Sequence, residues 1–135
     1  MADRIRKSPY YYSTVDDKPG EGARVLKAFK DAGVNLLAFH AFPSKGKAQL
    51  DFFPADADKF AAAAKKANIA LSAKKTAFLL EGDDRVGAVH ETLDKLGKAG
   101  VNVTAVDAVA SGGRYGALLW VKEGDVDKAT KALGA

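Results

Sequence analysis

The sequence has no cysteine, and this absence excludes disulfides, thiolate metal sites and thiol nucleophiles together. No apolar run approaches the ~20 residues that a helix needs to span a bilayer. Residues 1–9 carry Arg4, Arg6 and Lys7 but no apolar core after them, so no signal peptide is expected. A cytoplasmic protein without membrane contact is therefore the prediction, although the missing cysteines alone leave the redox compartment open.

Recognisable catalytic motifs are also missing. The two histidines, His40 and His90, belong to no HxxxH or HExxH motif and to no carboxylate cluster in the sequence, so we predict no metal site. The serines and threonines show neither a nucleophile elbow nor a partnered base. The sequence thus predicts no catalytic residue, no metal and no cofactor.

The charge is nearly balanced. A net charge of +4 with 28% charged residues gives only a mild preference for anionic partners. Because 17 acidic side chains are interspersed with the basic ones, we interpret the surface as solvated and mixed, and nucleic-acid binding is not expected. The apolar content of 47% is normal for a water-soluble domain.

What the chain does contain is an internal repeat. A shift of 67 positions places residues 16–20 on residues 83–87, and residues 33–35 on residues 100–102. The same shift aligns further identical residues: Leu26, Ala32, Ala38, Ala41, Ser44 and Gly46 fall on Leu93, Ala99, Ala105, Ala108, Ser111 and Gly113. A duplicated module of this length leaves little room for a separate catalytic domain. Each half would be marginally stable alone, so we expect the two, residues 1–73 and 74–135, to share a core or a sheet.

In the first half, strand and helix patterns alternate. Residues 10–15 are aromatic and β-branched, which favours a strand, and turn residues follow them. Asp17 is placed to cap the next helix and Gly33 to end it. The apolar stripe of this helix consists of Gly22, Val25, Leu26, Phe29, Ala32 and Gly33. Further strands are predicted at 34–42, 48–53 and 69–73, with an alanine-rich helix at 60–67, so the order is βαββαβ.

The second half repeats this order with one loss. Strands are predicted at 76–81, 101–109 and 115–122, and a last helix at 125–133. The first helix of this half has its stripe at Val89, Thr92, Leu93, Leu96, Ala99 and Gly100. No fourth strand follows, so this sheet has three strands, or the residues around Ile5 or a neighbouring chain complete it. Since an uncovered strand edge is a pairing site, we expect a homodimer.

Two such units resemble the ACT family of small regulatory domains. The resemblance covers residues 10–133, and its most specific parts are Asp17-Lys18-Pro19-Gly20, Val25-Leu26 and Ala32-Gly33-Val34-Asn35. The second copy departs from the family in having Val86 where proline is usual. The resemblance implies an α+β fold of two ferredoxin-like units, with antiparallel sheets and helices on one face. It also implies a small effector, usually an amino acid, bound near the loop after the first strand, and an enzyme of amino-acid metabolism as partner.

The residue types in this loop suit an amino acid on physical grounds. Gly20 and Gly87 precede helix starts, where free backbone N–H groups favour a carboxylate. Asp17 and Asp84 offer an acceptor for an ammonium group, while Asn35 and Asn102 offer donors and acceptors. The simpler alternative is that all of these are caps and turn residues. Pro19 pre-orders the first loop, so the first copy is predicted to hold the better site. The predicted site residues are Asp17, Pro19, Gly20, Asn35, Asp84, Gly87 and Asn102.

Two other functions remain open at this point. A small isomerase or mutase would use His40 as its acid and base, with Asp107, its counterpart in the repeat, or Asp51 as partner. RNA-recognition domains share the ferredoxin-like topology, but the third strands, 48–53 and 115–120, lack the basic and aromatic pattern of those domains. RNA binding is therefore the less favoured of the two.

Overall fold

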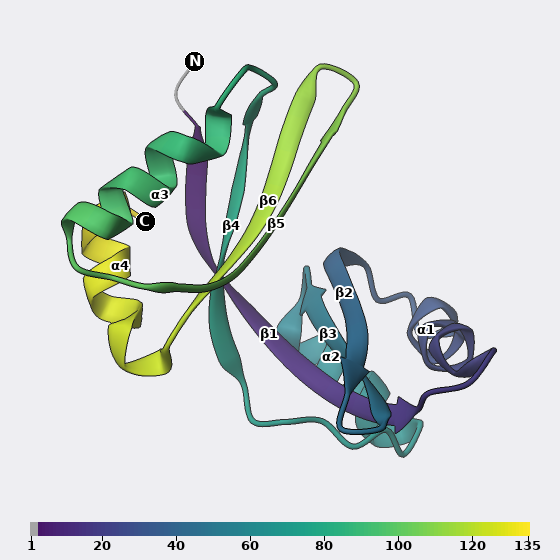
Figure 1. The fold of residues 1–135 in the computed structure, drawn as a ribbon. Helices are drawn as coiled ribbons and strands as arrows, with labels where there is room; N and C mark the ends of the chain where they lie inside the picture. The colour runs from purple at the N-terminus through teal and green to yellow at the C-terminus, as the bar shows by residue number, and fades with distance from the viewer. Residues whose placement is uncertain (1–2) are drawn as a thin grey trace. The chain divides into compact units, whose positions relative to one another are not determined.

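A computed structural model describes residues 3–135, and these form two compact units (Figure 1). The first unit is Pro9–Lys75, and the second is Thr76–Ala135 together with the described part of Met1–Ser8. These units differ from the predicted segments 1–73 and 74–135 because residues 3–8 belong with the second half of the chain. Each unit has a sheet and two α-helices, which confirms the α+β class.

The first unit contains the second half of strand β1 (Arg4–Asp16), helix α1 (Glu21–Asp31), strands β2 (Leu36–Ser44) and β3 (Lys47–Pro54), and helix α2 (Ala57–Lys66). Its strands lie in the order β2-β3-β1 and pair antiparallel. The side chains that bind the helices to the sheet are aromatic: Phe60 of α2 stacks on Phe29 of α1 with ring centroids 4.4 Å apart and contacts Phe52 of β3 at 5.4 Å. Both helices therefore cover one face.

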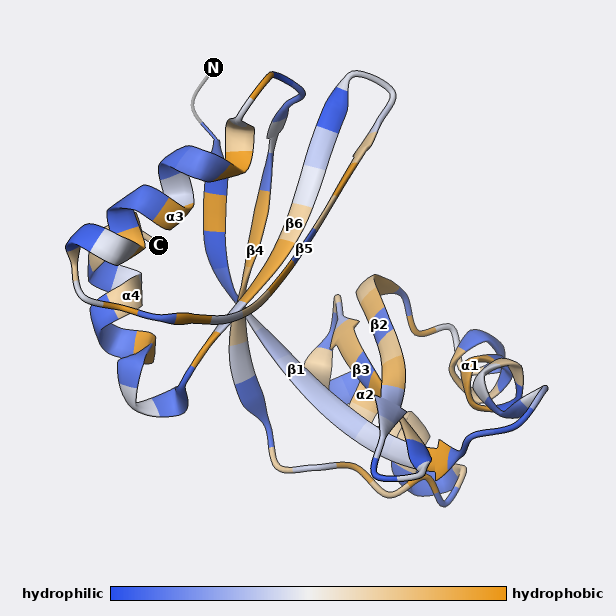
Figure 2. Cartoon of the chain, in the orientation of Figure 1, coloured by the Kyte–Doolittle hydropathy of each residue, from blue (hydrophilic) through white to orange (hydrophobic). Residues whose placement is uncertain are grey.

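The second unit contains β4 (Lys75–Asp83), α3 (Ala88–Lys98), β5 (Val103–Ser111), β6 (Arg114–Val121), a short 3-10 turn (Glu123–Asp125) and α4 (Val126–Leu133). Its core joins α3 and α4 to the strands through Phe78, Leu80, Ala88, Leu96, Leu119, Ala129 and Leu133. In Figure 2, β4 and β6 carry apolar residues along their middle parts, whereas the two helices are mixed. This pattern is typical of helices that bury one side against a sheet.

The fourth strand of the second unit comes from the N-terminus. The strand order of this sheet is β1-β4-β6-β5, Ile5 packs against the second core, and Arg4 contacts Glu81 of β4. In the part of the chain that the structure describes, no strand follows α4. Of the possibilities left open by the sequence, the residues around Ile5 are therefore the ones that complete the sheet.

The predicted strand at 69–73 is wrong. Ile69 and Leu71 pack against the first core, but the segment has no regular ladder. The N–H of Ser72 donates to the carbonyl of Tyr12 at 2.8 Å, and the Ser72 hydroxyl oxygen accepts from the N–H of Tyr12 at 2.9 Å. The Ser72 side chain thus accepts the hydrogen bond from Tyr12 that a backbone carbonyl would accept in a regular ladder.

The helix starts also differ from the prediction. Gly20 and Gly87 are themselves the N-caps of α1 and α3, with φ of 89° and 73°, and neither helix has a side-chain cap. Asp17 is therefore not a cap. The helix ends were predicted correctly, because Gly33, Gly100 and Gly134 all have left-handed backbone just after a helix.

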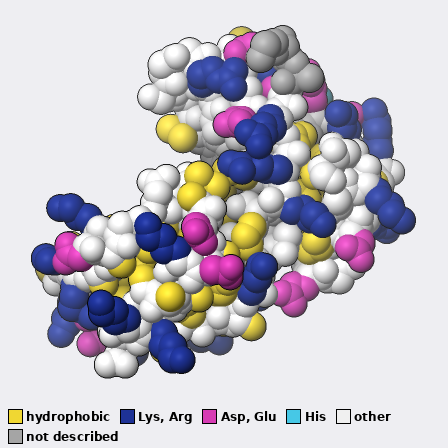
Figure 3. All heavy atoms as spheres, turned by 180° about the vertical axis from the view of Figure 1, so that it is seen from behind, with side chains coloured by type: hydrophobic (Ala, Val, Ile, Leu, Met, Phe, Trp, Pro, Cys, Tyr) yellow, Lys and Arg dark blue, Asp and Glu magenta, His cyan; other side chains and the backbone are white. Residues whose placement is uncertain are grey.

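The distribution of charge on the surface and the length of the helices bear on binding to nucleic acids and membranes. Figure 3 shows basic and acidic side chains interspersed over the visible face, as the composition predicted. Within residues 3–135, no helix combines the length and the apolar character needed to cross a bilayer.

Candidate functional site

The loop between β4 and α3 borders a cleft of about 310 Å³. Two predicted residues, Asp84 and Gly87, line this cleft together with Arg85, His90 and Tyr115. The N–H of Asp84 donates to the carbonyl of Gly113 at 3.0 Å, which ties the loop to the β5–β6 turn while the Asp84 side chain stays exposed. The left-handed backbone at Gly87 then starts α3 without a side-chain cap, and the N–H groups of Ala88 and His90 donate to the carbonyls of Arg85 and Gly87 at 3.3 and 3.0 Å.

The corresponding loop of the first unit carries Asp17, Pro19 and Gly20. All three are exposed and lie between the end of β1 and the start of α1. The conformation repeats that of the second loop, since the glycine before each helix has positive φ. The two loops are therefore the same structural feature with different side chains, Lys18-Pro19 in one and Arg85-Val86 in the other.

The structure does not bring Asn35 to the first loop within its own unit. Asp16, beside the loop, lies opposite Lys47, whereas Leu36, beside Asn35, lies opposite Pro54 at the far end of β3. Seven residues of strand separate those positions, which is about 23 Å at ~3.3 Å per residue.

The same geometry holds in the second unit, where Asp83 lies opposite Arg114 and Val103 lies opposite Val121. Asn102 is therefore also at the far end of its sheet from Asp84 and Gly87. The aspartates and glycines of each unit are brought together, and the asparagines are not.

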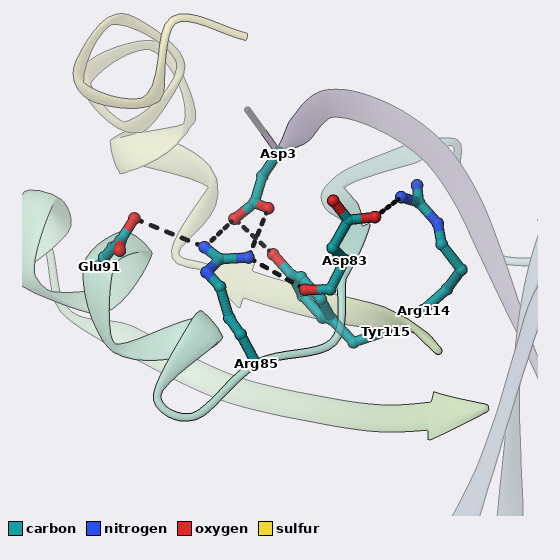
Figure 4. Close-up of polar contacts among 6 residues, drawn as sticks. All are labelled: Asp3, Asp83, Arg85, Glu91, Arg114 and Tyr115. Carbon is teal, nitrogen blue, oxygen red and sulfur yellow. Dashed lines mark hydrogen bonds and ion pairs between the residues drawn. The ribbon is translucent and has the colours of Figure 1, made fainter. Parts of the chain in front are cut away.

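Sequence reasoning missed a carboxylate–guanidinium cluster beside the second loop (Figure 4). Arg85 donates to both carboxylate oxygens of Asp3, each at 3.0 Å. Tyr115 of β6 donates its hydroxyl to the same carboxylate at 2.7 Å. Arg85 also donates to the carbonyl of Asp83 at 3.1 Å and lies 3.5 Å from Glu91. One guanidinium thus joins the N-terminus, the loop and helix α3.

The cluster shifts the pKa of its members. The hydrogen bonds from Arg85 hold the pKa of Asp3 below its usual value, although burial of the Asp3 carboxylate opposes the shift. Burial, together with the hydrogen bond to Asp3, raises the pKa of Tyr115 to about 12. The carboxylate is therefore ionised and the phenol protonated at neutral pH, as the hydrogen bond between them requires.

Gly82 makes room for this cluster. It lies directly opposite Tyr115 in the β4–β6 ladder, and a Cβ added to it would meet the Asp3 carboxylate and approach Cε1 of Tyr115 to 2.9 Å. Because its φ is not in the left-handed region, the close packing alone requires glycine here.

The ion pair between Asp83 and Arg114 in this cluster could have been predicted from the internal repeat. Asp16 and Lys47 form an ion pair at 2.6 Å in the first unit, and Asp83 and Arg114, their counterparts 67 positions on, form one at 2.6 Å in the second. Asp3 has no counterpart in the first copy, since the repeat begins after it. Nothing in the sequence points to its contact with Arg85.

A second cleft, of about 560 Å³, is also lined by Arg85. Its walls come from the start of β1, from α3 and from the end of α4, and its charged lining residues are Asp3, Arg4, Arg85, Glu91 and Lys95. Arg85 lines both clefts.

The histidines take different positions. His40 of β2 lies directly opposite Asp51 of β3. Asp51 is only 4% exposed, accepts a hydrogen bond from Gln49 at 3.0 Å, and has its pKa raised by burial. Asp107 lies on β5 in the other unit. His90 is exposed on α3, as predicted. Among residues 3–135, no group of acidic or histidine side chains is arranged to hold a metal ion.

Comparison with known proteins identifies the fold. No protein-family model and no curated protein matches the sequence. Protein BT0572 from Bacteroides thetaiotaomicron superimposes with a TM-score of 0.83 at 18% identity, over 96% of this chain and 88% of that one. The ligand-free regulatory subunit of aspartate kinase from Thermus thermophilus gives 0.66 at 13% identity, over 99% and 95%. An aspartokinase structure with alpha and beta subunits gives 0.64 at 16% identity, over 98% and 95%. At these identities the likeness concerns the fold, which is that of two ACT-like units.

Proposed function

We propose that this protein is a non-catalytic regulator that binds a small effector, an amino acid, at the loops before α1 and α3. The observation that carries this proposal is the cleft beside Asp84 and Gly87, because it lies at the loop to which the ACT resemblance points. Two of the similar folds are named as subunits of aspartate kinase or its regulatory part, which supports a regulatory role.

The chemistry of the loops supports an amino acid in particular. The helix starts have no side-chain cap, and the positive end of each helix dipole favours a carboxylate there. The exposed carboxylate of Asp84, or of Asp17 in the first loop, can accept from an ammonium group. Pro19 and Gly20 complete the first site. Asn35 and Asn102 cannot contact a ligand at the loop of their own unit, because each lies at the far end of its sheet from that loop.

Association with a second copy and with an enzyme is part of the proposal. The edge strands β2 and β5 expose apolar side chains, with Val109 70% and Leu37 41% exposed. Unpaired strand edges with apolar residues favour strand pairing, so we propose a homodimer. The partner enzyme is one of amino-acid metabolism, by analogy with the aspartate kinase subunits of similar fold.

A thermal-shift screen against the twenty amino acids tests this function. A ligand at 100 times its Kd should stabilise the protein by roughly 2.7 kcal/mol, and calorimetry then measures the affinity. If no amino acid shifts the transition, the proposed effector class is wrong.

Matched variants then locate the site. Asp84→Asn and Gly87→Asn should weaken binding in the second loop, and Asp17→Asn and Gly20→Asn should do so in the first, so each pair is the control for the other. Asparagine is chosen for the glycines because it tolerates positive φ. Unchanged affinity in all four folded variants would show that these residues are structural.

A further inference from the structure

The Asp3 carboxylate occupies a site built by other parts of the chain. Two parallel N–H···O bonds from Arg85 and one O–H···O bond from Tyr115 converge on it, and its side chain is only 10% exposed. The donors come from the β4–α3 loop and from β6, whereas Asp3 stands directly before β1. Bidentate guanidinium geometry of this kind recognises any carboxylate, tethered or free.

The space next to Asp3 is charged and open. Arg4, Arg85 and Lys95 line the 560 Å³ cleft, against Asp3 and Glu91. Lys95 forms no ion pair within the described chain, yet its charge helps to lower the pKa of Asp3. Without the Asp3 carboxylate, three cations would face one anion. A volume of this size is in the range of small-molecule sites.

We propose that this cleft of the second unit is a binding site for a small dicarboxylate, and that Asp3 occupies its anion position until the ligand displaces it. One carboxylate of the ligand takes the three hydrogen bonds that Arg85 and Tyr115 now give to Asp3. The other carboxylate meets Lys95. This site is distinct from the amino-acid site that we propose in the loop cleft, although Arg85 lines both clefts.

A dicarboxylate is the class that the geometry favours over a monocarboxylate. A single carboxylate would make only the bonds that Asp3 already makes, and Asp3 is present at the high effective concentration of a tethered group. A second carboxylate adds an attraction to Lys95 that Asp3 does not supply. Displacement is feasible because Asp3 is held at one end of a strand and Arg85 remains 35% exposed.

Succinate titrations with the full chain test this site. Calorimetry should show that Asp3→Ala binds succinate at least about tenfold more tightly than the wild type, because the internal competitor is gone. Acetate should bind Asp3→Ala more weakly than succinate does. Adding Arg85→Lys to Asp3→Ala should weaken succinate binding at least about tenfold, because lysine cannot make the bidentate contact.

Arg114→Gln in the Asp3→Ala background is the matched control. It removes a nearby cation that pairs with Asp83 and lines neither cleft, so succinate affinity should stay unchanged. If Asp3→Ala does not fold, Asp3→Asn removes the charge at constant size. In the unsubstituted protein, excess succinate should shift the NMR signal of the Arg85 side chain.

Three results would overturn the proposal: no succinate binding by a folded Asp3 variant, equal binding after Arg85→Lys, or an unmoved Arg85 signal under excess succinate. Asp3 and Arg85 would then be a purely structural pair. None of these results would bear on amino-acid binding at the Asp17 loop, which has its own variants.

Discussion

Replacing Gly82 with alanine tests the packing on which the Asp3 cluster depends. The added Cβ would meet the Asp3 carboxylate and lie 2.9 Å from Cε1 of Tyr115. Tyr115 is only 6% exposed and belongs to the second core, so its ring cannot move out of the way, whereas Asp3 can leave. We therefore expect Gly82→Ala to break the Asp3–Arg85 pair and to strain the ring.

The magnitude follows from two opposing effects. Alanine in place of glycine restricts the unfolded chain and stabilises by about 0.4–1 kcal/mol, while overpacking costs about 1–3 kcal/mol. The free energy of unfolding should therefore fall by about 1–2 kcal/mol. Gly116 is the control, since it lies opposite Glu81 in the same ladder and its added Cβ would come no nearer than 3.8 Å to the Leu80 carbonyl. Gly116→Ala should stabilise by about 0.5 kcal/mol.

Urea unfolding followed by tryptophan fluorescence measures both variants. Trp120 is the single tryptophan and lies on β6, the strand that also carries Tyr115. In an Asp3→Ala background the cost of Gly82→Ala should shrink by at least about 0.5 kcal/mol, because one of the two clashes is gone. Equal effects of the two glycine substitutions, or a cost independent of Asp3, would refute the reasoning.

Three further predictions concern other parts of the molecule. Since burial raises the folded-state pKa of Asp51, its contribution to stability is lost as the pH rises above about 4. Asp51→Asn should thus be more stable than wild type at pH 7 in urea titrations, and the difference should narrow toward pH 4. Phe60→Ala should lose about 3–5 kcal/mol of unfolding free energy by circular dichroism, and Phe60→Leu markedly less. Asp3→Asn should lower the pKa of Tyr115 from about 12. In an alkaline titration the tyrosinate absorbance of Tyr115 should then appear at lower pH, and Tyr115→Phe, which lacks this absorbance, identifies the signal.

The repeated elements could be predicted because their signals are local. The apolar stripe that ends at Gly33 and its copy that ends at Gly100 fix both first helices, and the positive φ of these glycines agrees with that prediction. The strands β3 and β6 were also predicted to within two residues at each end. Such patterns depend on periodicity and turn residues within about ten positions.

Two segments depend instead on partners that are distant in sequence. The residues around Ile5 were only one of the possibilities left open for completing the second sheet, and the predicted strand at 69–73 was wrong. Residues 4–8 are polar apart from Ile5 and have no strand signal of their own, yet they are strand because β4 offers them an edge. Residues 69–73 have the apolar pattern of a strand, but the hydroxyl of Ser72 replaces a ladder bond. In both places a partner distant in sequence decides the conformation, and the sequence pattern does not contain it.

The candidate site also combines features that local sequence predicts with a contact between residues distant in sequence. The positions of the loop glycines and aspartates could be predicted because they stand at fixed places before each helix, whereas Asp3 and Arg85 are 82 positions apart and meet only once β1 has joined the second sheet. Arg85 lines both clefts, so the two proposed ligands would share this guanidinium, and any effect of one ligand on the affinity of the other would be reciprocal. The first copy has no counterpart of the Asp3–Arg85 contact, because the residues that bring Asp3 to Arg85 belong to the second unit.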